Sequence, residues 1–154
     1  TDPIEIFKKA LGTRVNFIQD NHSLSKAGVI RGLHYQVNPY AQGKLVRVIS
    51  GSAIDVAVDL RRSSPSFGMH FKQELSEYNK LSMWIPEGFA HGFLSLEDNT
   101  QFLYKTTNKY SPEDERTIKY NDSTLNINWS DNTDIIQSES DLKGVEFENA
   151  DYFN

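Results

Sequence analysis

The feature that most constrains this fold is a hydrophobic period of two residues, which begins near Val15 and weakens after Tyr110. The apolar positions hold mostly β-branched and aromatic residues, and both kinds favour strands. The predicted strands, separated by turn-rich linkers, cover residues 15–19, 29–36, 44–50, 53–60, 68–75, 81–85, 91–96 and 101–107. Many short strands with almost no helix between them indicate an all-β antiparallel sandwich or small barrel, closed as a jelly roll.

Segment 53–60, AIDVAVDL, shows the period most plainly. One face of this strand carries the large aliphatic side chains Ile54, Val56, Val58 and Leu60, and the other carries the small or acidic side chains Ala53, Asp55, Ala57 and Asp59. Because strand side chains alternate between the two faces of a sheet, the two faces of this sheet have different chemical surroundings.

The two ends of the chain depart from the strand pattern. The first twelve residues, TDPIEIFKKALG, are typical of a short peripheral helix that Gly12 can end. Thr1 or Asp2 suits its cap, and Pro3 suits its first turn. The residues after Tyr110 are rich in turn formers, so we expect a C-terminal flap over the barrel or a loose tail.

Composition limits both the compartment and the partners. At 154 residues the chain is expected to form a single domain, residues 1–154, with a real core. It has no cysteine, which excludes thiolate chemistry and fits the cytoplasm, the predicted location. The net charge of -5 argues against a nucleic-acid partner, because such partners need a dense basic surface. No apolar run reaches the ~20 residues that span a bilayer, so no membrane partner is expected.

The segment RGLHYQ places two polar groups inside a predicted strand. Strict alternation puts His34 and Arg31 on opposite faces of the sheet. Both groups reach one ligand only if a kink at Gly32 or a β-bulge breaks the alternation. Taken alone, a strand histidine is more often a partly buried, hydrogen-bonded residue than a catalytic base.

A second segment, WIPEGFAHGFL, places a Pro-x-Gly turn just before His91. It resembles the second motif of the cupin superfamily, whose double-stranded β-helix jelly rolls often bind a metal at this histidine. The usual partner motif, His-x-His with a later Glu, is absent because Tyr35 and Gln36 follow His34. The two motifs supply at most two metal ligands, whereas a metal site needs three or four. No metal site is therefore predicted.

Six segments together resemble one family, the dTDP-4-dehydrorhamnose 3,5-epimerases, also called RmlC-like cupins. They are RGLHYQ, AQGKLVRVISG, DVAVDLRRSSPSFG, WIPEGFAHGFLSL, FLYKTTNKYSPEDE and NINW. The resemblance runs in order from about Val15 to Asp141, and several independent motifs in order make it highly specific. It implies a cupin jelly roll, a homodimer, and an isomerase whose substrate is a nucleotide sugar.

The resemblance also implies a reaction, the inversion of carbons 3 and 5 of dTDP-4-dehydro-6-deoxyglucose without a cofactor. Inversion beside a ketone needs a base, a cation near the enolate oxygen, and an acid on the opposite face. His34 matches the family's base, and Asp141 matches the carboxylate paired with it. Lys44 matches the residue near the enolate oxygen, and Tyr104 matches the acid.

The remaining candidates are expected to bind the substrate. Arg31 is the best local candidate for the diphosphate, because a guanidinium can bond two phosphate oxygens. Gln19 and Asn21 resemble family residues that approach the nucleotide, and Tyr110 is expected to line or stack over the pocket. His91 is expected to face the sugar, in a positioning or a structural role.

The chain departs from the family at its start. The family normally begins with a few tens of further residues, including strands and an Arg-Gly-Phe-Phe-like segment that crosses to the partner subunit. Here the domain is expected to lack those N-terminal strands. Two alternatives stay open: an epimerase that inverts only carbon 3 or only carbon 5 of a related sugar, and a non-catalytic or metal-binding cupin.

Overall fold

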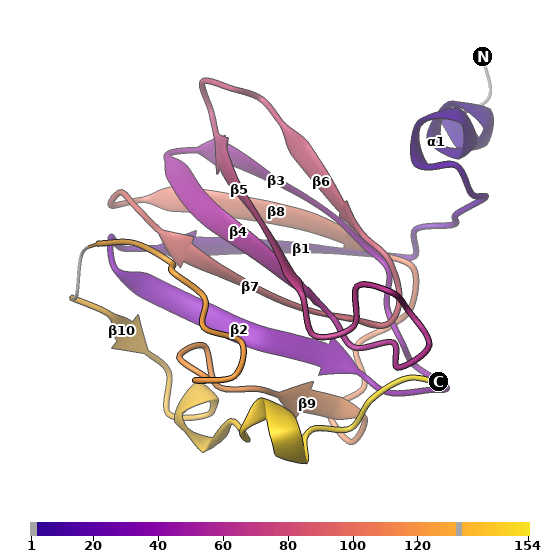
Figure 1. Cartoon of the computed structure of the whole chain (residues 1–154). Helices are drawn as coiled ribbons and strands as arrows, with labels where there is room; N and C mark the ends of the chain where they lie inside the picture. The colour runs from indigo at the N-terminus through magenta and orange to yellow at the C-terminus, as the bar shows by residue number, and fades with distance from the viewer. Residues whose placement is uncertain (1–2, 132–133) are drawn as a thin grey trace.

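Two β-sheets that face each other form the body of the chain, as the computed structural model shows for residues 3–131 and 134–154 (Figure 1). The elements in chain order are α1 (Pro3–Leu11), β1 (Gln19–Ser25), β2 (Val29–Gln36), β3 (Lys44–Ser50), β4 (Ser52–Asp59), β5 (His70–Ser76), β6 (Ser82–Ile85), β7 (Phe89–Ser95), β8 (Thr100–Thr106), β9 (Glu115–Thr117), β10 (Ile136–Gln137), and the 3-10 helices η1 (Asp141–Lys143) and η2 (Phe147–Asn149). The smaller sheet has the order β1-β8-β3-β6. The larger has the order β10-β2-β7-β4-β5, with β9 also paired to β2. This architecture confirms the predicted all-β jelly roll with a short N-terminal helix.

The strand predictions hold for β2 to β8, and the prediction for β1 is wrong. The sequence predicts a strand at residues 15–19, whereas β1 covers Gln19–Ser25 and pairs along its whole length with β8. β1 is an edge strand of mostly polar residues, with one face exposed and the other turned toward a polar interior. A prediction based on apolar and β-branched residues therefore does not find β1. The preference of these residues for strands reflects the burial of their side chains more than the formation of the strand itself.

Helix α1 is where the sequence places it, and Figure 1 shows it standing apart from both sheets. Phe7 attaches it through an edge contact to Phe17, whose ring in turn contacts Trp84 of β6. The predicted caps, Thr1 and Asp2, lie outside the described residues. Among the helices that the structure describes, none is long and apolar enough to cross a membrane.

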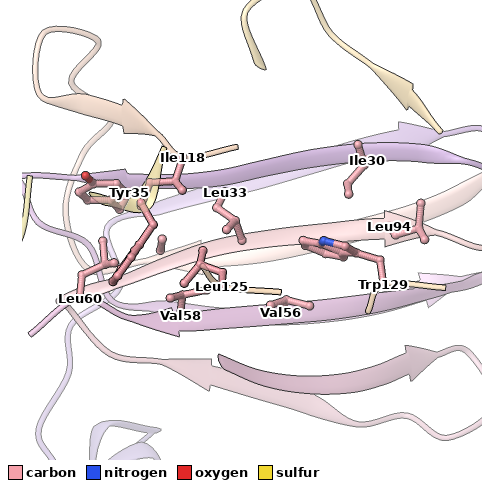
Figure 2. Close-up of a cluster of buried hydrophobic side chains, with 12 residues drawn as sticks. Ile30, Leu33, Tyr35, Val56, Val58, Leu60, Leu94, Ile118, Leu125 and Trp129 are labelled. Carbon is pink, nitrogen blue, oxygen red and sulfur yellow. The ribbon is translucent and has the colours of Figure 1, made fainter. Parts of the chain in front are cut away.

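Two hydrophobic cores hold the sheets in place, one on each face of the larger sheet. The inner core lies between the sheets and contains Val46, Val48, Ala53, Ala57, Leu75, Ile85, Phe93 and Phe102. The outer core covers the opposite face of the larger sheet and contains Ile30, Leu33, Tyr35, Val56, Val58, Leu60, Ala90, Leu94, Ile118, Leu125, Trp129 and Phe147 (Figure 2). The two unlike faces predicted for segment 53–60 are confirmed, since its small residues face inward and its large ones face outward.

The C-terminal segment is a packed cover over the larger sheet, which confirms the flap and excludes the loose tail for the described residues. Leu125, Trp129 and Phe147 bury their side chains in the outer core. The Trp129 indole donates a 2.8 Å hydrogen bond to the Tyr120 carbonyl. Burying a large apolar side chain contributes about 1.5 to 3 kcal/mol, so these residues fix the flap firmly.

Candidate active site

A cavity of about 330 Å³ opens between the two sheets. It is lined by Asn21, Ser23, Arg31, His34, Lys44, His91, Gly92, Phe93, Tyr104, Tyr110 and Glu115. All the site residues predicted from sequence line this cavity except Gln19 and Asp141, and each of these two contacts a residue that does. Residues far apart in the chain thus converge on one site.

Strand β2 departs from regular alternation so that Arg31 and His34 both face the cavity. Its register with β7 shifts between these two residues. Gly32 has a φ of +107°, and Leu33 turns into the outer core, where it is fully buried. The break in alternation that would let Arg31 and His34 reach one ligand is therefore present in β2. Gly32 makes it possible, because glycine tolerates a positive φ.

Replacing Gly32 with Ala is expected to lower the free energy of unfolding by about 1 to 3 kcal/mol or more. A Cβ at this position would lie 2.5 Å from the His91 carbonyl oxygen and 2.8 Å from the Gly92 Cα, both backbone atoms. Gly12→Ala is the matched control, because Gly12 also has a positive φ, +71°, but its Cβ would meet nothing within 4 Å. Urea denaturation of both variants tests this, and equal losses would show that crowding at Gly32 is unimportant.

His34 and Asp141 form a hydrogen-bonded dyad across β2 and η1. The His34 Nε2 lies 2.5 Å from Asp141 Oδ1, and the backbone N–H of Gly32 donates to Oδ2 at 3.1 Å. Burial acts to raise the pKa of Asp141, but the hydrogen bonds from His34, Gly32 and Ser138 outweigh it and lower the pKa. The carboxylate therefore stays ionised and orients the ring, so that Nδ1 is the ring nitrogen turned away from Asp141.

His91 and Asp55 form a second dyad directly beside the first. His91 is the register partner of His34, and its Nε2 lies 2.6 Å from Asp55 Oδ1. Burial lowers the pKa of His91 although Asp55 acts to raise it, so the ring is neutral near pH 7. Asp55 was not predicted as a site residue. The one feature of the sequence that could have indicated Asp55 is its acidic side chain on the small-residue face of a buried strand.

Lys44 and Tyr104 lie on the opposite wall, on β3 and β8 of the smaller sheet. The Lys44 Nζ lies 5.8 Å from the centre of the Tyr104 ring. Burial lowers the pKa of Lys44 to about 8, while Glu115 and Asp55 act to raise it. Burial and the charge of Glu115 raise the pKa of Tyr104. A cation and a protonated phenol thus face the histidines across the cavity.

The buried charge of Lys44 predicts that stability changes with pH in a defined window. Its pKa falls from an ordinary value near 10.5 to about 8 in the folded chain, so the unfolded chain binds more protons between these values. The free energy of unfolding of the wild type is therefore expected to rise relative to Lys44→Met as the pH increases from 8 to 10.5, by on the order of 3 kcal/mol. Denaturation of both proteins at several pH values tests this, and a constant difference would contradict it.

A hydrogen-bonded chain borders the mouth of the cavity. Gln19 donates to Asn21 Oδ1 at 3.0 Å and accepts from the Tyr110 backbone N–H at 3.0 Å. The Tyr110 hydroxyl donates to Glu115 Oε2 at 2.6 Å. Arg31 lines the same region, where its only side-chain partner among the described residues is the Ser25 hydroxyl. Glu115 was not predicted from sequence, because a Glu that begins a short strand carries no signal of its own.

The described residues contain no group of three or more His, Asp or Glu side chains arranged to hold a metal ion. His34 and His91 each direct Nε2 at an aspartate instead. The polar groups that line this cavity are thus two imidazoles, an ammonium, a guanidinium, two phenols, an amide, a hydroxyl and a carboxylate, a set that suits proton transfer and anion binding.

Comparison with known proteins matches most of the chain to a known family of enzymes. The family model for dTDP-4-dehydrorhamnose 3,5-epimerase matches residues 4–149. The dTDP-4-dehydrorhamnose 3,5-epimerase of Shigella flexneri is 52% identical over 149 residues, which cover 97% of this chain and 82% of that protein. The similarity therefore includes every residue of the cavity.

Solved structures agree with the sequence comparison. The crystal structure of dTDP-4-dehydrorhamnose 3,5-epimerase from Elizabethkingia anophelis matches with a TM-score of 0.93 and 43% identity, over 98% of this chain and 83% of that one. The dTDP-6-deoxy-D-glucose-3,5-epimerase of Legionella pneumophila, in complex with dTDP-4-keto-L-rhamnose, matches with a TM-score of 0.92 and 42% identity, over 98% of this chain and 80% of that one.

Proposed function

Because the chain belongs to the dTDP-4-dehydrorhamnose 3,5-epimerase family, we propose that its cavity binds a dTDP-linked 4-keto-6-deoxyhexose and that His34 and Tyr104 carry the proton transfers. The reaction is the family's own. It inverts carbons 3 and 5 of dTDP-4-dehydro-6-deoxyglucose to give dTDP-4-dehydrorhamnose, and the enzyme is an isomerase. The observation that carries the assignment of roles is the placement of the His34–Asp141 dyad and Tyr104 on opposite walls of one cavity.

In the proposed mechanism His34 removes the proton next to the ketone. A neutral imidazole accepts a proton on its free ring nitrogen, and the Asp141 carboxylate stabilises the imidazolium that results. The electron pair moves onto the ketone oxygen, which becomes an enolate beside the Lys44 ammonium. Tyr104 then donates a proton from the other wall, so the carbon is inverted. The imidazolium then releases its proton to solvent and the tyrosinate takes one up, after which the same groups serve the second carbon.

The remaining side chains are proposed to bind the nucleotide diphosphate and the sugar. Arg31 has no carboxylate partner among the described residues, so its guanidinium is available for phosphate oxygens. Asn21 and Tyr110 border the mouth, and Gln19 holds both in place. His91 is proposed to position the sugar as a neutral imidazole.

We also propose that the protein works as a homodimer in the cytoplasm. The absence of cysteine is compatible with a reducing compartment. The edge strand β5 is exposed on both faces over residues 71–74, a surface that a second copy can cover. Light scattering over a range of protein concentrations tests the dimer, and a monomer at all concentrations would contradict it.

Incubation with dTDP-4-dehydro-6-deoxyglucose in deuterated water tests the function directly. Mass spectrometry is expected to count two incorporated deuterium atoms, and NMR is expected to locate them at carbons 3 and 5. Deuterium at one carbon only would replace the double epimerase with a single one. No deuterium at either carbon, with the nucleotide sugar still bound, would leave only a binding protein.

A further inference from the structure

Among the described residues that line the cavity, Glu115 is the one carboxylate, and it has no role in the proposed mechanism. It begins β9, where it pairs with Gln36 of β2, directly after the loop that follows β8. Lys44, Tyr104, Arg31 and Tyr110 line the same cavity. A carboxylate in a pocket that is proposed to receive a diphosphate opposes binding through like-charge repulsion, so its presence needs a compensating role.

The loop before β9 is held rigidly, so the position of Glu115 is well defined. The side chain of Gln36, which is buried, donates to the carbonyls of Tyr40 and Lys109 and accepts from the Ser111 backbone N–H. The Ser111 hydroxyl in turn donates to Asp114 at 2.5 Å. Glu115 is thus placed by the fold, and not only by its own hydrogen bond to Tyr110.

The protonation of Lys44 depends on charges that it does not contact directly, because its ammonium has no hydrogen-bond or ion-pair partner among residues 3–131 and 134–154. Its side chain is only 8% exposed. The charged or titratable groups around it come from each neighbouring element and are Arg31 and His34 of β2, Asp55 of β4, His91 of β7, Tyr104 of β8, Glu115 of β9, Tyr110 of the mouth loop and Asp141 of η1. Against the burial that favours neutral lysine, Glu115 is the largest opposing influence and Asp55 is the second.

Tyr104 responds to the same carboxylate. After burial, the charge of Glu115 contributes most to raising the pKa of Tyr104, while Arg31 acts in the opposite direction. Glu115 therefore favours the protonated form of both residues on this wall. Those are the forms that the proposed reaction requires, since Lys44 must be a cation and Tyr104 must have a proton to donate.

We propose that Glu115 is a positioning residue of this site, whose carboxylate shares the cavity with the Lys44 ammonium and the Tyr104 hydroxyl and holds the Tyr110 hydroxyl at the mouth. Its negative charge stabilises the protonated forms of Lys44 and Tyr104. The inference rests on the proposed function and adds to it a residue, Glu115, that does not touch the reacting atoms and acts through Lys44, Tyr104 and Tyr110. The charge of Glu115 is expected to affect the alkaline limb of the pH profile of kcat/KM. The hydrogen bond between Glu115 and Tyr110 is expected to affect KM.

The test compares the pH dependence of kcat/KM for the wild type and for Glu115→Gln, which keeps an acceptor for Tyr110 but removes the charge. Without the carboxylate, Lys44 and Tyr104 lose their protons at lower pH. The ratio of wild-type to variant kcat/KM is therefore expected to rise about threefold or more between pH 7 and pH 9, equivalent to a shift of about half a pH unit in the alkaline limb. A constant ratio across this range would overturn the electrostatic role.

Tyr110→Phe is the matched control, because it removes the hydrogen bond and leaves the carboxylate in place. It is expected to raise KM while the alkaline limb stays where it is in the wild type. If its alkaline limb moves as far as that of Glu115→Gln, the hydrogen bond rather than the charge sets the limb, and the inference fails.

A readout without substrate separates this inference from the proposed function. The titration of Lys44 can be followed by NMR in protein labelled with 13C at the lysine Cε, with Lys44→Met identifying the resonance. The midpoint is expected to fall in Glu115→Gln whether or not the wild type catalyses exchange. An unchanged midpoint would contradict the inference, whereas a wild type that exchanges no deuterium would contradict only the proposed function.

Discussion

Replacing His34 with Gln is expected to reduce deuterium incorporation at both carbons by about 100- to 10,000-fold, the contribution of a well-placed proton-transfer group. The Gln side chain can still donate to Asp141 but cannot accept a proton in the relevant pH range. Both carbons should be affected equally, because one base is proposed for both. Binding of dTDP should stay within a few-fold of the wild type, since Arg31 and the mouth residues are unchanged.

His34→Ala provides the comparison that separates catalysis from stability. Alanine leaves Asp141, which is only 3% exposed, with the backbone of Gly32 and the nearby Ser138 as its hydrogen-bonding neighbours. His34 itself is 30% exposed, so the loss is that of one hydrogen bond to a buried carboxylate, typically about 1.5 to 3 kcal/mol. We therefore expect both variants to lose turnover and only His34→Ala to lose substantial stability. Unchanged exchange in His34→Gln would remove His34 as the base.

The fold was predictable from sequence wherever burial and strand structure coincide. Strand β4 is the clearest case, because its alternation of large and small residues follows from two different cores on its two faces. Strand β1 was not predictable, because its residues Gln19–Ser25 are polar and its pairing with β8 supplies the order. The packed flap was only partly predictable: its turns are visible in the sequence, whereas the burial of Trp129 depends on the larger sheet, whose strands β2, β4 and β7 all precede the flap in the chain.

The candidate site also contains residues that the sequence suggests and residues that only the structure reveals. His34, Lys44 and Tyr104 lie within strands and within motifs that resemble the family, so sequence alone suggests them. Asp141 came from the resemblance only, and its role depends on a contact 107 residues away in the chain. Asp55 and Glu115 were missed because an isolated acid in a strand is informative only when its neighbours in space are known.

Replacing Tyr104 with Phe is expected to separate deuterium exchange from inversion. His34 and Tyr104 come from different sheets, so the two groups approach a sugar between them from opposite faces. Phe preserves the ring, with its contacts to Phe102 and to the Lys44 ammonium, but removes the proton donor. We expect the rate of inversion to fall by about 100- to 10,000-fold.

Exchange without inversion is the distinctive part of this prediction. In Tyr104→Phe, His34 can still remove a proton, exchange it with solvent and return a deuteron to the same face of the carbon. The starting sugar is therefore expected to gain deuterium with its configuration retained, which NMR coupling constants distinguish from the inverted product. If exchange and inversion decline together, Tyr104 acts before or during proton removal, as a residue that supports Lys44 or the enolate, and the opposite-face acid must be another group of the cavity wall.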